Sequence, residues 1–159
     1  MSQNDDLYRS RTPSGWHDDA QHRDAGHDEM QAAVWRWLST QEGERDGDLT
    51  WVQVEYPFIA RERYGTRIVA FGDVVAYSRS GVYLIYEVKP IIHSVGAVIR
   101  QLSAIEHAFS RITDRHSGRP YPCVVRAVVP AHDPKLKLLG EMSRWGVVVW
   151  HAAAGRPVT

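Results

Sequence analysis

Two β-prone segments near the middle of the chain are separated by only three residues. The segments "IVAFGDVVAYS" (68–78) and "VYLIYEVK" (82–89) are rich in branched and aromatic residues, and Arg79, Ser80 and Gly81 lie between them. That composition is typical of strands, and a short loop ending in glycine is typical of a type I turn closed by a left-handed residue. The sequence therefore predicts an antiparallel hairpin with Ser78 opposite Val82.

The register of this hairpin determines where its charged residues lie. With the three-residue loop, Asp73 falls directly opposite Glu87, and Lys89 lies on the same face as both. A four-residue loop would shift the register by one residue and place the two acids on opposite faces. The predicted convergence of these charges therefore depends on the turn.

Two opposed acids in a sheet need a physical reason. Opposed side chains are about 5 Å apart at Cβ, where like charges are destabilising, and burial adds the loss of hydration. A divalent cation removes the repulsion, and Asp and Glu oxygens are ligands that Mg²⁺ prefers. Lys89 would orient or activate a water or stabilise an anionic transition state, so the set favours metal-dependent phosphodiester hydrolysis. Alternatively, Asp73 is a turn-associated acid, and Glu87 and Lys89 are strand-end charges facing solvent.

The rest of the chain predicts an α/β fold around this hairpin. The apolar periodicity of Met30, Val34, Trp37 and Leu38 indicates a helix, and similar patterns predict the other elements. In chain order these are helix 27–39, strands 49–58, 68–78 and 82–89, helix 94–113, strand 123–130, helix 133–146 and strand 147–151. The order α-β-β-β-α-β-α-β implies a mixed sheet, parallel in its second half and flanked by helices. Residues 59–67 are expected to be a loop or an extension of a hairpin.

Composition limits the class of protein. The 159 residues are 43% hydrophobic, enough for one globular domain, which we place at 27–159 after a polar tail at 1–26. No apolar run is long enough to span a membrane and no signal-peptide core is present, so we expect a cytoplasmic protein. Cys123 is the only cysteine, which excludes a disulfide framework or a thiolate zinc site within the chain.

These residues resemble the PD-(D/E)XK nuclease superfamily. "GD" at 72–73, "EVK" at 87–89, a preceding helical glutamate and "RQL" at 100–102 in the following helix are similar to its signature. The resemblance covers roughly residues 27 to 151 and is nearest to Holliday-junction-resolvase-like enzymes and small bacterial or phage DNA-repair nucleases. It implies a restriction-endonuclease-like αβββαβ core.

The resemblance assigns roles to individual residues. Asp73 and Glu87 would be Mg²⁺ ligands, with Mn²⁺ as a substitute, Lys89 the catalytic lysine, and the Val88 backbone carbonyl a further ligand. Glu29 matches the first-helix acid that many members use as an additional ligand; alternatively it is an acid favoured by the helix dipole. Gln101 matches a helical glutamine of several branches, with a surface or capping role as the alternative.

Departures from the family pattern narrow the resemblance. Gly72 replaces the proline of the family name, and Ile105 stands where a tyrosine often follows the helical glutamine, which argues against the RecB-like branch. The single cysteine excludes the branch that carries an iron-sulfur centre.

Several other residues are candidates for a supporting role. Glu55 is an acid that supports the metal ligands or lies beside the metal, or else a surface acid that pairs with Arg61 or Arg67. His93 could face a phosphate, although a loop histidine without a task is the simpler interpretation. The tail carries His17 and His22, which with His27 and neighbouring aspartates form either a weak chelating set or a solvated segment.

The 19 basic and 19 acidic residues give no net charge, so a DNA contact requires a local cationic patch. The candidate cations lie in the "IARERYGTR" segment and on the second helix with its following loop. They are Arg67, Arg100, Arg111, Arg115 and Arg119, with Arg61, Arg63 and His116 nearby. Alternatively, they form an ordinary solvated face.

Three functional hypotheses follow from these patterns. The first is a Mg²⁺-dependent deoxyribonuclease, an endonuclease of DNA repair, recombination or restriction, whose partner is DNA and which needs no small-molecule cofactor. The second is a catalytically silent nuclease fold that docks DNA or protein. The third is a nuclease that works as a homodimer or only within a larger protein complex.

Overall fold

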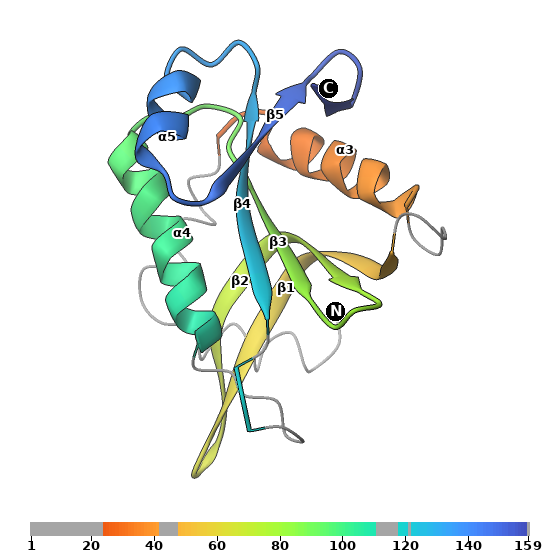
Figure 1. Ribbon diagram of the computed structural model, residues 1–159, viewed down its shortest axis with the longest axis vertical. Coiled ribbons are helices and arrows are strands. Elements are labelled where there is room, and N and C mark those ends of the chain that lie inside the picture. The colour runs from red at the N-terminus through yellow and green to blue at the C-terminus, as the bar shows by residue number, and fades with distance from the viewer. Residues whose placement is uncertain (1–23, 42–47, 111–117, 121, 159) are drawn as a thin grey trace.

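The computed structural model describes residues 24–41, 48–110, 118–120 and 122–158. Its elements are α3 (His27–Ser39), β1 (Leu49–Glu62), β2 (Gly65–Ser78), β3 (Tyr83–Val88), α4 (Val95–Ser110), β4 (Cys123–Pro130), α5 (Leu136–Met142), β5 (Gly146–His151) and β6 (Arg156–Pro157) (Figure 1). The predicted α/β class and order of elements are confirmed, and a short strand, β6, is added at the end. Of the two alternatives for residues 59–67, the extended hairpin is the one observed.

The strands form one mixed sheet. Its order is β1-β2-β3-β4-β5-β6, with antiparallel pairs from β1 to β3, parallel pairs from β3 to β5, and an antiparallel pair between β5 and β6. The two parallel steps are the ones that α4 and α5 connect, as a parallel crossover requires. The prediction of a sheet that is parallel in its second half is confirmed.

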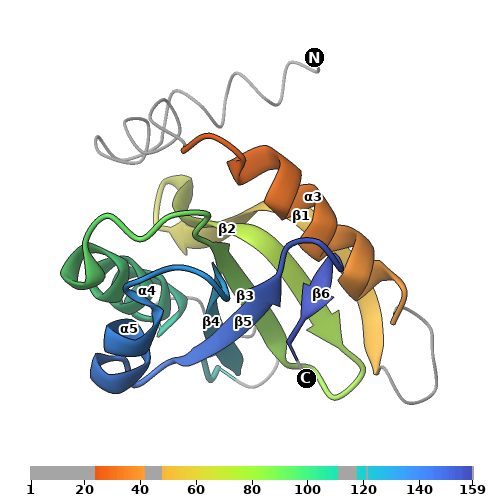
Figure 2. The same cartoon turned by 90° about the horizontal axis from the view of Figure 1, so that it is seen from above.

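Helices cover both faces of the sheet (Figure 2). On one face Leu102, Ile105 and Phe109 of α4 join the core around Ile85, with Leu139 of α5 beside them. On the other face α3 packs the stripe of Met30, Val34 and Leu38 against residues of β2, β3 and β4. Each helix therefore buries the apolar face that its sequence pattern indicates, and the sheet is sandwiched between them.

The hairpin between β2 and β3 has the predicted register. Val74 pairs with Tyr86 and Val75 with Ile85, so the next position along the two strands sets Asp73 against Glu87. The Ser78 N–H donates to the Val82 carbonyl at 2.9 Å, which closes a three-residue loop. Gly81 has a φ of 84°, the left-handed conformation that this turn demands of its last residue.

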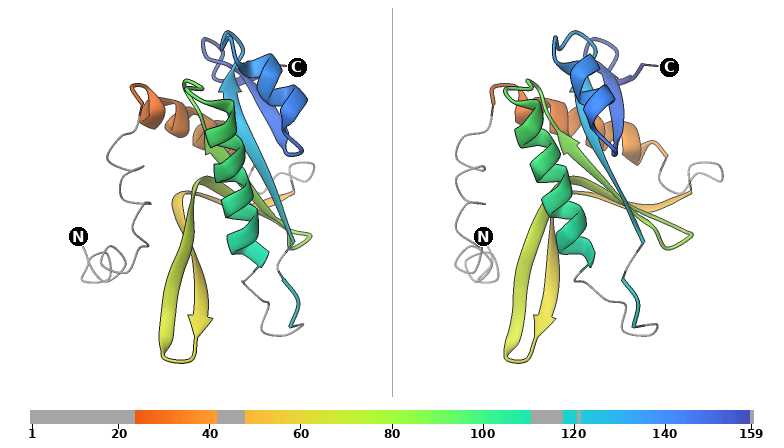
Figure 3. Two further views of the ribbon diagram at one scale, coloured as in Figure 1. Left: turned by 90° about the vertical axis from the view of Figure 1, so that its left-hand side faces the viewer. Right: turned by 60° about the vertical axis from the view of Figure 1, so that its left-hand side comes forward.

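The strands β1 and β2 continue past the end of β3. Only residues 74–77 of β2 pair with β3, whereas β1 and β2 pair with each other out to Glu62 and Gly65. Their outer halves therefore form a two-stranded ribbon that leaves the main sheet (Figure 3). Asp73 lies where this ribbon departs from the sheet.

Candidate functional site

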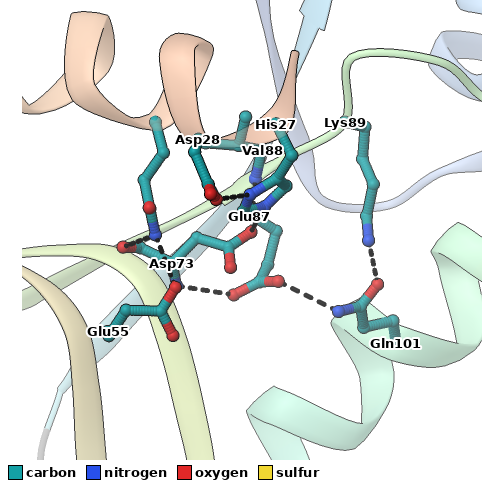
Figure 4. A network of polar contacts seen from close by, with 9 residues as sticks. His27, Asp28, Glu55, Asp73, Glu87, Val88, Lys89 and Gln101 are labelled. Atoms are coloured by element: carbon teal, nitrogen blue, oxygen red, sulfur yellow. Dashed lines mark hydrogen bonds and ion pairs between the residues drawn. The ribbon is translucent and has the colours of Figure 1, made fainter. Parts of the chain in front are cut away.

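Asp73 and Glu87 meet at the end of the β2–β3 hairpin (Figure 4). The Asp73 N–H donates to Glu87 Oε1 at 3.3 Å, and the Val88 N–H donates to Asp73 Oδ2 at 2.9 Å. Each acid therefore accepts a hydrogen bond from the backbone of the other strand. The predicted convergence is present, and the alternative register, with the acids on opposite faces, is excluded.

The two carboxyl groups differ in their electrostatics. Burial raises the pKa of Glu87, which is 1% exposed, well above its usual value, and the neighbouring charge of Asp73 raises it further. Burial is the largest influence on Asp73 and opposes its ionisation, but the hydrogen bond and charge of His27, the Val88 N–H and the charge of Lys89 together leave the pKa of Asp73 lowered. Without a further cation, a second negative charge at this point is unfavourable.

Helix α4 reaches the site through Gln101. Its Nε2 donates to Glu87 Oε2 at 3.0 Å, and its Oε1 accepts a hydrogen bond from Lys89 Nζ. One amide therefore links the buried acid to the ammonium group. Gln101 is half-buried and contacts both Glu87 and Lys89, the place that the resemblance implies for it.

Helix α3 reaches the site through His27 and Gln31, one turn apart. His27 Nε2 lies 3.4 Å from Asp73 Oδ2, and its Nδ1 lies 3.2 Å from Asp28 Oδ1. The Gln31 amide donates to the Asp73 carbonyl and to Glu55 Oε1, both at 2.9 Å. His27 is only 8% exposed and Gln31 only 7%. Both residues are therefore part of the buried polar network around Asp73.

Glu29, the predicted first-helix ligand, lies elsewhere on α3. It is exposed, and at 3.6 residues per turn it points to the side of the helix opposite His27 and Gln31. Neither residue was predicted to lie beside Asp73; His27 was grouped with the tail histidines as a chelating set or a solvated segment, and the solvated alternative does not hold for this buried side chain. The available signal was their spacing of four residues beside the apolar stripe of Met30 and Val34.

Glu55 is half-buried and contacts the site through Gln31. It has a φ of 51° within β1, a conformation that L-residues rarely adopt. The contact with Gln31 agrees with the predicted supporting role.

His93 and the end of the predicted tail lie together at the edge of the site. His93 is exposed, and its Nε2 lies 2.6 Å from Asp24 Oδ1. Lys135 Nζ donates to the His93 carbonyl. Of the predicted tail at 1–26, only residues 24–26 are described, and they form the turn that precedes α3.

The predicted DNA-contacting arginines come from separate segments. Arg67 is half-buried on β2, Arg100 is exposed on α4, and Arg119 is exposed before β4. Arg111 and Arg115 lie outside the described residues. Contact of these arginines with DNA stays a prediction.

The donor chemistry of the site fits a hard divalent cation. The Asp73 side chain is 16% exposed, and its Oδ2 accepts the Val88 N–H. Glu87 places a second carboxyl group beside this carboxylate, and the Val88 carbonyl belongs to the same strand end. In the part of the chain that the structure describes, no group of three or more His, Cys, Asp and Glu residues is arranged to hold a metal ion. A cation here would therefore be bound by the two acids together with a backbone oxygen or water. A small movement of His27 would add its imidazole as a third side-chain ligand.

Comparisons with known proteins give no relative. No family model, no curated protein and no solved structure matches the chain. None of the described helices is long and apolar enough to cross a membrane.

Proposed function

We propose that the chain is a metal-dependent nuclease that hydrolyses DNA phosphodiester bonds, with the PD-(D/E)XK arrangement that the sequence resembles. The observation that carries the proposal is the meeting of Asp73 and Glu87 at one strand end, with Lys89 joined to Glu87 through Gln101. Burying two acids side by side is unfavourable, and such pairs are found mainly at functional sites. A divalent cation offsets that cost and supplies the Lewis acidity that phosphodiester hydrolysis needs.

The residues that would hold Mg²⁺ or Mn²⁺ come from three elements. Asp73 from β2 offers its carboxylate, and the Glu87 carboxylate and the Val88 carbonyl come from β3. His27 from α3 is a further candidate in place of the exposed Glu29. Its Nε2 lies 3.4 Å from Asp73 Oδ2, longer than a good hydrogen bond but suited to two ligands of one ion.

Lys89 supplies a positive charge that the two acids lack, and Gln101 holds it in place. Hydrolysis adds water across one P–O bond, so negative charge develops on the phosphate oxygens in the transition state. The Lys89 ammonium stabilises that charge or orients the attacking water. Gln101 holds Lys89 by accepting its hydrogen bond and holds Glu87 by donating one, so both are positioned before substrate binds.

A cleavage assay with matched variants tests the proposal. The protein is incubated with Mn²⁺ or Mg²⁺ and a panel of linear, circular, branched and single-stranded DNA, with an RNA duplex as an additional substrate. We expect Asp73→Asn and Glu87→Gln to abolish cleavage and Lys89→Met to slow it about 10²–10³-fold, while the circular dichroism spectra of all three stay native.

The matched controls for this assay lie on α5. Lys137→Met and Glu141→Gln change an exposed lysine and an exposed glutamate of an i,i+4 pair far from the acids in sequence. They should cleave as the wild type does. Cleavage that survives all three site variants, or that does not depend on a divalent cation, would overturn the proposal.

A further inference from the structure

Side chains of the β1–β2 ribbon change face at Glu55 and Asp73. In β1, Trp51 packs against the core under α4. Tyr56 and Phe58 are an odd number of residues from Trp51, so in a regular strand they would point to the other face. Both nevertheless pack against the same core as Trp51. In β2, Ala70 and Val75 contribute to the same core although they are an odd number of residues apart. Both strands therefore lose their alternation at the same level.

The ladder is interrupted at this level. Val54 pairs with Val74 and Tyr56 with Gly72, whereas the described ladder contains no pair between Glu55 and Asp73. Glu55 carries the left-handed φ of 51°, which is strained for a residue other than glycine. Such strain is maintained only where surrounding contacts enforce it.

The contact that accompanies this strained position comes from α3. Gln31 uses its side-chain amide for two hydrogen bonds of 2.9 Å, one to the Glu55 carboxylate and one to the Asp73 carbonyl. Because Gln31 is buried, neither bond competes with bulk water. The amide thus ties both strands of the ribbon together at the point where the ladder is broken.

We infer that Gln31 and Glu55 are positioning residues that fix the backbone of Asp73 so that its carboxylate faces Glu87 and the end of β3. The reason is geometric. The Asp73 carbonyl is held by Gln31 while its Oδ2 accepts the Val88 N–H at 2.9 Å, so the residue is fixed at two points. Releasing the carbonyl lets the ribbon return to regular alternation, which moves the Asp73 carboxylate away from Val88.

The Val88 amide reports this geometry in the metal-free protein. Its hydrogen exchange is slow only while it donates to Asp73 Oδ2. We expect Gln31→Met, which keeps the length of the side chain but removes the amide, to speed Val88 exchange about tenfold or more. Glu55→Gln keeps an acceptor for Gln31 and should retain near wild-type exchange. Gln53→Met changes an exposed residue of the same strand and should have no effect.

The catalytic part of the inference rests on the proposed function. Since residues that support a metal ligand typically change affinity 10–100-fold, Gln31→Met should weaken Mn²⁺ binding by about that factor, measured by calorimetric titration. If the wild type binds no Mn²⁺ while Gln31→Met still exposes the Val88 amide, the positioning role stands and the metal site is refuted. If Gln31→Met leaves Val88 exchange at the wild-type rate, the positioning role is refuted whatever the metal does.

A second variant covers the case in which Gln31→Met does not fold. Glu55→Gly accepts the left-handed φ without strain but removes the carboxylate that receives the Gln31 hydrogen bond. We expect it to fold and to speed Val88 exchange to a smaller extent than Gln31→Met. Wild-type exchange in Glu55→Gly would overturn the role of Glu55.

Discussion

The site is held from two sides of the sheet by two glutamines that do different work. On the α4 side, Gln101 bonds the side chains of Glu87 and Lys89, the groups proposed to act on the substrate. On the α3 side, Gln31 bonds the Asp73 backbone and Glu55, and His27 approaches the Asp73 carboxylate. The α4 side therefore holds reactive groups directly, whereas the α3 side shapes the strand that carries one of them.

The largest expected effect is on the α4 side. Lys89→Met removes the ammonium group that Gln101 holds, and loss of one such electrostatic donor costs about 10²–10³-fold in rate. Gln101→Leu leaves the ammonium in place but free to move, so we expect a smaller loss of about tenfold. Single-turnover cleavage rates at saturating Mn²⁺ measure both. A Gln101→Leu loss equal to that of Lys89→Met would mean that Gln101 itself acts on the substrate.

The next effect concerns which residue of α3 reaches the cation. His27→Ala should weaken Mn²⁺ binding about 10–100-fold, because it removes the buried imidazole that lies beside the Asp73 carboxylate and is proposed as a further ligand. Glu29→Ala should change Mn²⁺ affinity little, because Glu29 is exposed on the opposite side of the helix. Calorimetric titration of the two variants compares them, and the reverse order would restore Glu29 as the ligand that the sequence predicts.

A third prediction separates stability from function at Glu87. Glu87→Gln removes a buried acid whose ionisation is unfavourable, so the metal-free protein should gain roughly 1 kcal/mol in free energy of unfolding at neutral pH. The variant should at the same time lose the stabilisation by Mn²⁺ that the wild type gains. Thermal melts with and without Mn²⁺ measure both changes, and a large destabilisation without metal would contradict the electrostatic account.

The same acid gives a pH dependence with a defined sign. The raised pKa of Glu87 means that the folded state binds its proton more tightly than the unfolded state, so stability falls as pH rises from 4.5, the ordinary pKa of a glutamate, toward the raised pKa. The lowered pKa of Asp73 acts in the other direction, and its contribution is lost as pH falls below 3.8. Melts of the metal-free wild type and of Glu87→Gln should therefore diverge only above pH 4.5.

The smallest expected effect tests the turn that brings the two sides together. Gly81→Ala introduces a side chain at a φ of 84° and should cost about 1 kcal/mol in free energy of unfolding. Gly140→Ala is the matched control, because a methyl group there, on α5, meets nothing within 4 Å. It should stabilise the helix by up to about 1 kcal/mol. Equal effects of the two substitutions in denaturant titrations would mean that Gly81 does not set the register.

The α4 side was largely predictable from sequence, and the α3 side was not. A three-residue loop ending in Gly81 allows one register, and that register determines the relative positions of Asp73 and Glu87 without further information. The apolar stripe of α4 then identifies the inward face on which Gln101 lies. Turn length and apolar periodicity are local patterns, and such patterns can be recognised in a single sequence.

The α3 contacts depend on long-range geometry. The apolar stripe of α3 does not say which strand its polar edge will meet, so the position of Gln31 beside Asp73, 42 residues away, was not visible. The left-handed φ of Glu55 was also invisible, because a glutamate in a β-prone segment predicts regular alternation. Glu29 was predicted from the acid that the family resemblance implies, and the rotation of α3 places it on the side of the helix away from Asp73.

Mn²⁺ binding to the wild type and to Asp73→Asn tests the central claim most directly. The claim is that the acids of β2 and β3 meet at one point to hold a divalent cation. Calorimetric titration should show saturable Mn²⁺ binding to the wild type and to the exposed-site control Glu141→Gln, and none to Asp73→Asn. Absence of binding to the wild type, or equal binding to Asp73→Asn, would contradict the account.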